Sequence, residues 1–146
     1  MSINDVYNGK ILEFAGNISR MGRLENPDAT AKAHSKLCGS TVTVDIVMEG
    51  DRVADYAQDV KACALGQSSA SIVARNVVGQ RAHDLRNLRE RMHDMLKEGG
   101  PAPDGIFADL AYLEPVRDYR ARHASTLLVF DALVDAPDQV EARKAA

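Results

Sequence analysis

An alternating run followed by a tight turn constrains the fold of this chain most. Residues 41–48 alternate between apolar side chains and mostly polar ones, which is the period of a half-buried β-strand. The turn Glu49-Gly50-Asp51 follows, and its glycine can adopt the positive φ that a hairpin turn needs. The return strand is expected to run from Arg52 to about Val60. The sequence therefore predicts an antiparallel hairpin.

The return strand leads to Cys63 and then to a helix of very small residues, which we expect to end near Gly79. The helix opens with Ala64, Gly66, Ser68, Ser69, Ala70 and Ser71. These side chains lack the bulk to fill a core, so they let neighbouring backbone approach closely. The sulfur of Cys63 should lie beside the free N–H groups of the first turn, where the helix dipole favours negative charge. Cys63 is a candidate reactive or metal-binding thiolate, and a buried structural cysteine is the alternative.

The chain contains two cysteines. Cys38 comes just before the outgoing strand, and Cys63 comes just after the return strand. Because antiparallel pairing brings those two strand ends together, we expect the cysteines to be neighbours in space. Coincidence and a reversible disulfide are the alternatives, and a reducing compartment argues against a permanent bridge.

The remaining pattern is helical. We expect an N-terminal helix over 1–21 with a capping box at Ser2-x-x-Asp5, and a loop over 22–36. Further helices are expected before Gly99, between 106 and Pro115, and from about 124 to 136, with a frayed tail over 137–146. The predicted class is α+β: one domain over 1–146, with a small antiparallel sheet of two or three strands and helices packed on one face.

Composition excludes several function classes. The chain is 45% apolar and 27% charged, which is ordinary for a globular protein. A net charge of -3 argues against a nucleic-acid partner. No apolar run approaches the ~18 residues of a membrane span, and the N-terminus lacks signal-peptide features. We therefore expect a cytoplasmic protein with no membrane partner. Phosphate-loop and dinucleotide fingerprints are absent from the sequence.

Three motifs in order resemble the NifU/IscU/SufU-type iron-sulfur cluster scaffold family, most closely its SufU branch. They are Cys38-Gly39 before a strand, Lys61-Ala62-Cys63-Ala64 before the small-residue helix, and Leu113-Glu114-Pro115-Val116-Arg117 before the last helix. The segment from Arg81 to Gly100 resembles the insertion of the SufU branch. The resemblance covers nearly the whole chain and implies an IscU/SufU-like fold.

The resemblance also implies a site. In that family two cysteines, an aspartate and a third cysteine converge on one metal. The first two correspond to Cys38 and Cys63, whereas the aspartate position holds Ser40 and the third cysteine position holds Ser125. A serine hydroxyl is a poorer ligand for iron or zinc than a thiolate. Weak candidates to complete the ligand set, besides these two serines, are His34 and His123.

The resemblance implies a scaffold or sulfur-acceptor protein that binds iron, an iron-sulfur cluster, zinc or a persulfide through Cys38 and Cys63. Cys38 is the candidate persulfide acceptor. The implied partners are a cysteine desulfurase, cluster carriers and apo-target proteins, and the chain would act as a carrier and not as a turnover enzyme. The alternative is a degenerate member that docks a desulfurase or carrier and makes no cluster. A dithiol redox protein is a third hypothesis, and self-association into a homodimer is left open.

Overall fold

The computed structural model describes residues 8–36 and 39–145. Its sheet has three antiparallel strands in the order β1-β2-β3. They are β1 (Ala29–His34), β2 (Thr41–Glu49) and β3 (Arg52–Lys61). The predicted hairpin is confirmed: β2 and β3 join at Gly50, whose φ is 65°. Thr41 lies opposite Lys61, so β2 begins where β3 ends.

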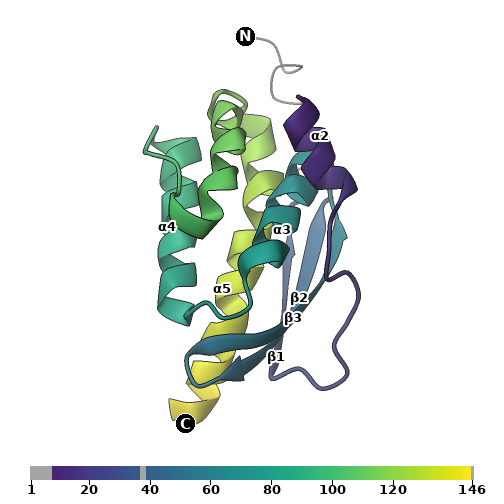
Figure 1. Ribbon diagram of the computed structural model, residues 1–146, viewed down its shortest axis with the longest axis vertical. Coiled ribbons are helices and arrows are strands. Elements are labelled where there is room, and N and C mark those ends of the chain that lie inside the picture. The colour runs from purple at the N-terminus through teal and green to yellow at the C-terminus, as the bar shows by residue number, and fades with distance from the viewer. Residues whose placement is uncertain (1–7, 37–38, 146) are drawn as a thin grey trace.

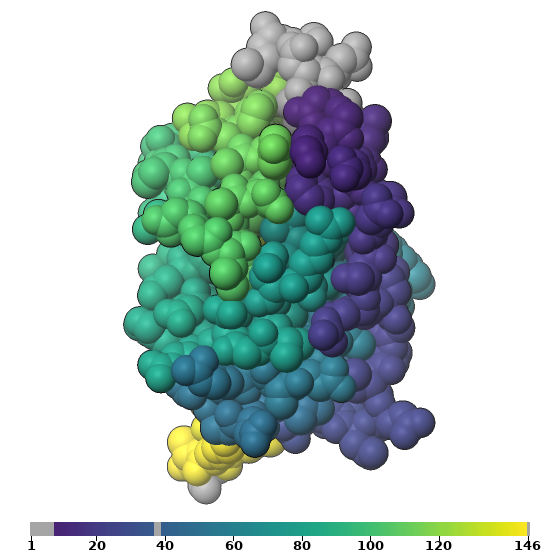
Figure 2. All heavy atoms as spheres, viewed as in Figure 1, coloured from purple at the N-terminus to yellow at the C-terminus, as the bar shows by residue number. Residues whose placement is uncertain are grey.

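Helices cover one face of this sheet (Figure 1). They are α2 (Gly9–Gly16), α3 (Ala64–Asn76), α4 (Ala82–Lys97) and α5 (His123–Ala145), with the 3₁₀ segments η1 (Gly105–Asp118) and η2 (Arg120–Arg122). α5 contacts β1 and β2, α3 contacts β3, and α4 packs on α5. α2 and η1 lie beside α3 on the face shown in Figure 2. The predicted α+β class is confirmed. No helix in the described ranges is long and apolar enough to span a bilayer.

The alternation in β2 sets the core. Val42, Val44 and Ile46 are fully buried under the helices, as the period-two pattern predicts. Removing such side chains from water contributes about 25 cal/mol per Å² of apolar surface. The helix of small residues, α3, lies in the same core, and its serines are buried. The Ser68 hydroxyl is 2.7 Å from the carbonyl oxygen of Ile11, so these serines bind backbone and hold α2 against α3.

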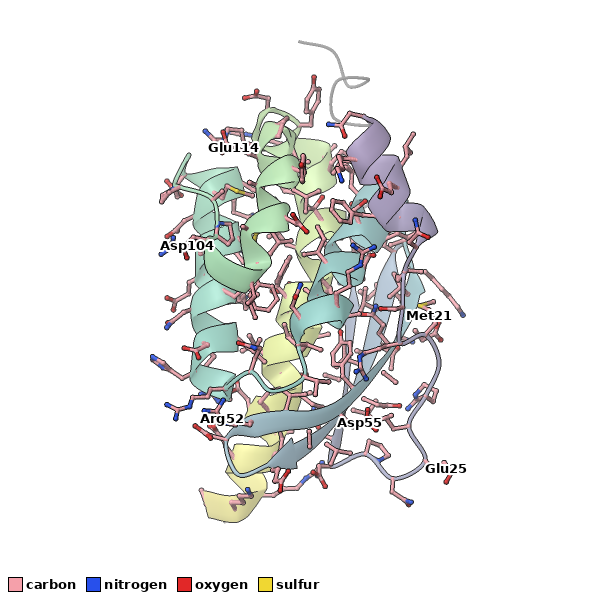
Figure 3. The ribbon with its side chains drawn as sticks, in the orientation of Figure 1. Met21, Glu25, Arg52, Asp55, Asp104 and Glu114 are labelled. Carbon is pink, nitrogen blue, oxygen red and sulfur yellow. The ribbon has the colours of Figure 1, made fainter. Side chains whose placement is uncertain are left out.

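A buried amide ties β3 to the chain around it. Gln58 is fully buried, and its Nε2 donates to the carbonyl oxygens of Ser19 and Ala70 at 3.2 and 3.1 Å. The hydroxyl of Tyr56 donates to Gln58 Oε1 at 2.8 Å. Burial raises the pKa of Tyr56 far above its ordinary value, so the phenol remains a neutral donor. This network fixes α3 on the sheet and holds the segment at Met21, labelled in Figure 3, along the edge of β3.

Two sequence predictions about the first third of the chain are wrong. The expected loop over 22–36 contains β1, whose buried positions are Ala29 and Ala31. Alanine does not favour strands, so the alternation carries no strand signal until β2 pairs with it. The expected N-terminal helix to residue 21 ends at Gly16, because the chain then turns to bond the edge of β3. The N-terminus of α2 is capped by Asn8, whose side-chain oxygen accepts a hydrogen bond from the Ile11 amide. The predicted capping box at Ser2-x-x-Asp5 lies outside the described residues.

Two predictions based on proline are also wrong. η1 continues through Pro115 to Asp118 as a 3₁₀ helix. α5 continues through the buried Pro137 to Ala145, so the predicted frayed tail is helical. Proline costs a helix interior one hydrogen bond. Here tertiary contacts offset that loss: Val140 is buried, and Gln139 Nε2 donates to the carbonyl oxygen of Thr30 at 3.0 Å.

On the face of the sheet away from the helices, the buried carboxylate of Asp45 binds the segment that precedes β1. Asp45 is 1% exposed and accepts hydrogen bonds from Arg23 Nε at 2.6 Å, Thr30 Oγ1 at 2.6 Å and the Leu24 amide at 3.0 Å. Burial raises the pKa of Asp45, but the hydrogen bonds from Arg23, Thr30 and Leu24 and the charge of Arg23 lower it below its ordinary value. The carboxylate thereby fastens the segment before β1 to the centre of the sheet.

The Asp45→Asn variant is expected to lower the free energy of unfolding by about 2 kcal/mol at neutral pH, because buried charged hydrogen bonds are lost. Because the pKa of Asp45 is depressed by folding, its stabilisation is fully present above the unfolded pKa of about 3.9 and is lost as the pH falls through the folded pKa. Urea unfolding between neutral pH and about pH 3 should therefore show the two proteins converging in acid.

Asp59→Asn is the matched control, since Asp59 on β3 lies on the same face of the sheet as Asp45 and its charge also acts on Arg23, but it accepts no hydrogen bond from the described residues. A difference between Asp45→Asn and the native chain that stays constant across this pH range would contradict the assigned role.

Candidate functional site

Cys63 lies where three elements meet. It follows the last pair of the β2–β3 ladder and is the N-cap residue of α3. It is half-buried and packs against the core. Its sulfur is 3.3 Å from Ser125 Oγ on the first turn of α5. β3 ends, and α3 and α5 begin, at the same end of the molecule (Figure 1). The fold thus brings together Cys63 and Ser125, which are 62 residues apart in the sequence.

Ser125 is 2% exposed, and its hydroxyl also lies 3.3 Å from the carbonyl oxygen of Arg122. A hydroxyl has one proton to donate. When that proton points to Arg122, the thiol of Cys63 can donate to Ser125; when Cys63 carries negative charge, the hydroxyl can turn and donate to the sulfur. Ser125 is therefore placed to accommodate both a neutral and an anionic sulfur.

Gly66 makes this contact possible, and nothing in the sequence distinguishes it from the other small residues of α3. A Cβ atom at Gly66 would lie 2.7 Å from Ala62 Cβ and 2.9 Å from the carbonyl oxygen of Ser125. Both are closer than non-bonded atoms approach. The absence of a side chain lets α3 touch the backbone of α5. The small-residue composition was the signal, but it does not tell which residue faces α5.

The other site position before β2 is only partly described. Ser40 is buried, and its carbonyl oxygen accepts a hydrogen bond from the Ser35 amide at 2.9 Å. Gly39 has φ 73° and donates to the Ser35 carbonyl oxygen at 2.8 Å. Cys38 lies outside the described residues, so its proximity to Cys63 stays a prediction. The register supports it, because residues 41 and 61 are paired at this end of the sheet.

The two histidine candidates lie in different settings. His34 ends β1, is exposed, and lies in register with Thr41. One further strand separates it from β3, which places its backbone about 10 Å from that strand. His123 is buried, with Nε2 3.0 Å from the carbonyl oxygens of Val116 and Arg117. Since carbonyl oxygens accept hydrogen bonds, Nε2 carries the proton and is occupied by the backbone.

The described donors form a partial ligand set. Among residues 8–36 and 39–145, no three His, Cys, Asp or Glu side chains cluster in a way that could hold a metal ion. Cys63 supplies one thiol and Ser125 one hydroxyl, whereas iron-sulfur clusters are usually held by four thiolates. This arrangement can carry a sulfur atom or contribute part of a metal shell, and further ligands must come from elsewhere.

Several known proteins are similar to this chain in sequence and in fold. The model of the NifU-like N-terminal domain matches residues 6–126. The IscU iron-sulfur cluster assembly scaffold protein of Thermotoga maritima is 23% identical over 90% of this chain and 92% of its own length. A crystal structure of a NifU-like protein (N-terminal) from Brucella abortus is 61% identical, with a TM-score of 0.95 over 97% of this chain and 98% of that one.

A putative SUF-system scaffold from Fervidobacterium islandicum shares the fold at 19% identity, with a TM-score of 0.84 over 93% of this chain and 99% of its own. The family match spans both Cys63 and Ser125. The chain belongs to the NifU-like N-terminal domain family of iron-sulfur cluster assembly scaffolds.

Proposed function

We propose that this protein carries sulfur or iron during iron-sulfur cluster assembly, with Cys63 and Cys38 as its two sulfur ligands. The observation that carries the proposal is the contact between Cys63 Sγ and Ser125 Oγ at 3.3 Å. It places a half-buried thiol at the N-terminus of α3, beside a hydroxyl at the position where the family resemblance implies a third ligand. The iron or cluster is cargo that is bound and passed on, so the chain acts by transfer and not by turnover.

The donor set favours transient carriage over stable storage of a cluster. Two thiolates supply half of the usual ligands, and neutral hydroxyls bind iron weakly. For sulfur transfer, a cysteine thiolate attacks the outer sulfur of a persulfide on a cysteine desulfurase. One S–S bond forms on this chain as the S–S bond on the desulfurase breaks, and the desulfurase cysteine leaves as a thiolate. The hydroxyl of Ser125 can donate to the negative sulfur of Cys63 before and after the step.

Anaerobic incubation with iron, cysteine and a cysteine desulfurase tests the proposal. The native chain should show visible charge-transfer absorbance, a mass gain of one sulfur atom on a cysteine, or both. Cys63→Ser is expected to reduce the iron retained after desalting by about tenfold or more. Changing a residue that only hydrogen-bonds to a metal ligand already lowers metal affinity by about that factor, and changing the ligand itself should lower it at least as much. Cys38→Ser tests the other thiol in the same way.

A second candidate function is docking without cargo, favoured by the hydroxyl of Ser125 where a thiolate is implied. It predicts unchanged binding of the desulfurase to the chain that carries both Cys38→Ser and Cys63→Ser. If the native chain acquires neither iron nor persulfide while the double variant still binds the desulfurase, the docking function replaces the carrier function. Unfolding curves of each variant show whether the fold is preserved.

A further inference from the structure

A pocket lined by positive charge lies beside the Cys63 site and takes no part in the proposed sulfur chemistry. It has a volume of about 400 Å³ and is formed by the end of α4, the end of η1, η2 and the start of α5. Its lining residues are Leu96, Lys97, Arg117, Arg120, His123 and Ala124. Three of these six are permanent cations and none is acidic, although the whole chain has a net charge of -3.

The cations of this pocket have few partners of their own. Lys97 and Arg120 are exposed, and neither forms an ion pair with a described residue. Arg117 meets Glu114, labelled in Figure 3, at 3.5 Å and the Gly100 carbonyl oxygen at 3.4 Å. Its Nε is buried and has no acceptor within the described ranges. The guanidinium can therefore reorient toward a bound anion without giving up a hydrogen bond from Nε.

Other hollows on α4 differ in charge. The hollow between α4 and the segment before η1 combines Arg91 with Asp84 and Asp104. An anion there would face two carboxylates. Around the pocket at Arg120, the carboxylate of Glu114 lies 3.5 Å from Arg117, and the carboxyl end of α4 adds roughly half a negative elementary charge. Glu98 and Asp118 are neighbours of Lys97 and Arg117 in the sequence but do not line the pocket, so the charge on its lining is positive.

The geometry points to a binding site for a small anion that carries phosphate or carboxylate groups, held by Lys97, Arg117 and Arg120. The volume is in the range of small-molecule sites, and guanidinium groups match both anions by bidentate hydrogen bonds. A small anion fits the concave shape better than an extended acidic surface does. The site goes beyond the proposed function, because neither cysteine lines it. It shares only the first turn of α5, where Ala124 faces the pocket and Ser125 contacts Cys63.

Titration of the full chain with inorganic phosphate, and separately with succinate, tests this site. Amide chemical shifts of His123 and Ala124 report binding, with sodium chloride added to keep the ionic strength constant. The expected result is a saturable shift for at least one anion. The affinity should fall when the titration is repeated at ~0.15 M ionic strength, where charges are screened beyond about 8 Å. The comparison of the two anions shows whether phosphate or carboxylate is the preferred group.

Arg120→Gln should weaken binding by about threefold, and Lys97→Gln with Arg120→Gln by about tenfold, as expected for exposed ionic contacts. Arg91→Gln is the matched control, since it removes one exposed arginine from α4 outside the pocket. Cys63→Ala should leave anion binding unchanged, which separates this site from the proposed carrier function. Shifts that do not saturate with either anion, or that respond equally to Arg120→Gln and Arg91→Gln, would overturn the assignment.

Discussion

Gly66→Ala is expected to lower the free energy of unfolding by about 3 kcal/mol, at the upper end of the usual cost of overpacking. The new methyl group would lie 2.7 Å from Ala62 Cβ and 2.9 Å from the Ser125 carbonyl oxygen. Both neighbours are fixed by short side chains or backbone, so neither can rotate away. α3 must then move from α5, which lengthens the contact between Cys63 and Ser125. Urea unfolding monitored by circular dichroism measures the loss.

Gly9→Ala is the control for this prediction. Gly9 is also helical and has no heavy atom within 4 Å of its added Cβ. Alanine favours helices over glycine by up to about 1 kcal/mol, so Gly9→Ala should leave stability unchanged or raise it. Equal effects of the two changes would show that α3 and α5 do not touch at Gly66.

Ser125→Cys is expected to tighten metal binding by about a hundredfold, because a neutral hydroxyl next to Cys63 becomes a third thiolate. Two thiolates bound to one tetrahedral zinc ion lie about 3.8 Å apart, as follows from Zn–S bonds of about 2.3 Å. The present distance of 3.3 Å between sulfur and hydroxyl oxygen needs only a small increase to match. Cobalt titration under reducing conditions, read from thiolate-to-metal charge-transfer absorbance, measures the affinity.

Two variants control this experiment. Ser69→Cys adds a cysteine at another buried serine, whose hydroxyl faces the Leu65 carbonyl oxygen within α3; it should not change the affinity. Adding Cys63→Ala to Ser125→Cys should remove the gain. If Ser125→Cys binds cobalt no better than Ser69→Cys, positions 63 and 125 do not contribute to one metal site.

Part of the fold was predictable because its signals are local. The alternation of residues 41–48 and the turn at Gly50 identify β2 and β3 without any knowledge of what packs on them. The strand β1 was not predictable in this way, since Ala29 and Ala31 become strand residues only by pairing with β2. Likewise Pro137 indicates a helix end by its own chemistry, whereas tertiary contacts made after it keep the helix intact. They include the packing of Val140, the contact of Gln139 with Thr30 and the ion pairs of Arg86 with Asp138 and Glu141.

The candidate site was likewise predictable only where its features depend on residue type and order. The sequence by itself determined that Cys63 precedes a helix of small residues, that Cys38 precedes a strand, and that serines stand at positions 40 and 125. These are properties of residue type and order, which are local. Only the tertiary structure decided that Ser125 reaches Cys63 and that Gly66 is the residue that permits it. It also decided that His123 bonds backbone and that Lys97, Arg117 and Arg120 line one pocket. Such distances depend on how separate elements pack, and that packing comes from the whole core acting together.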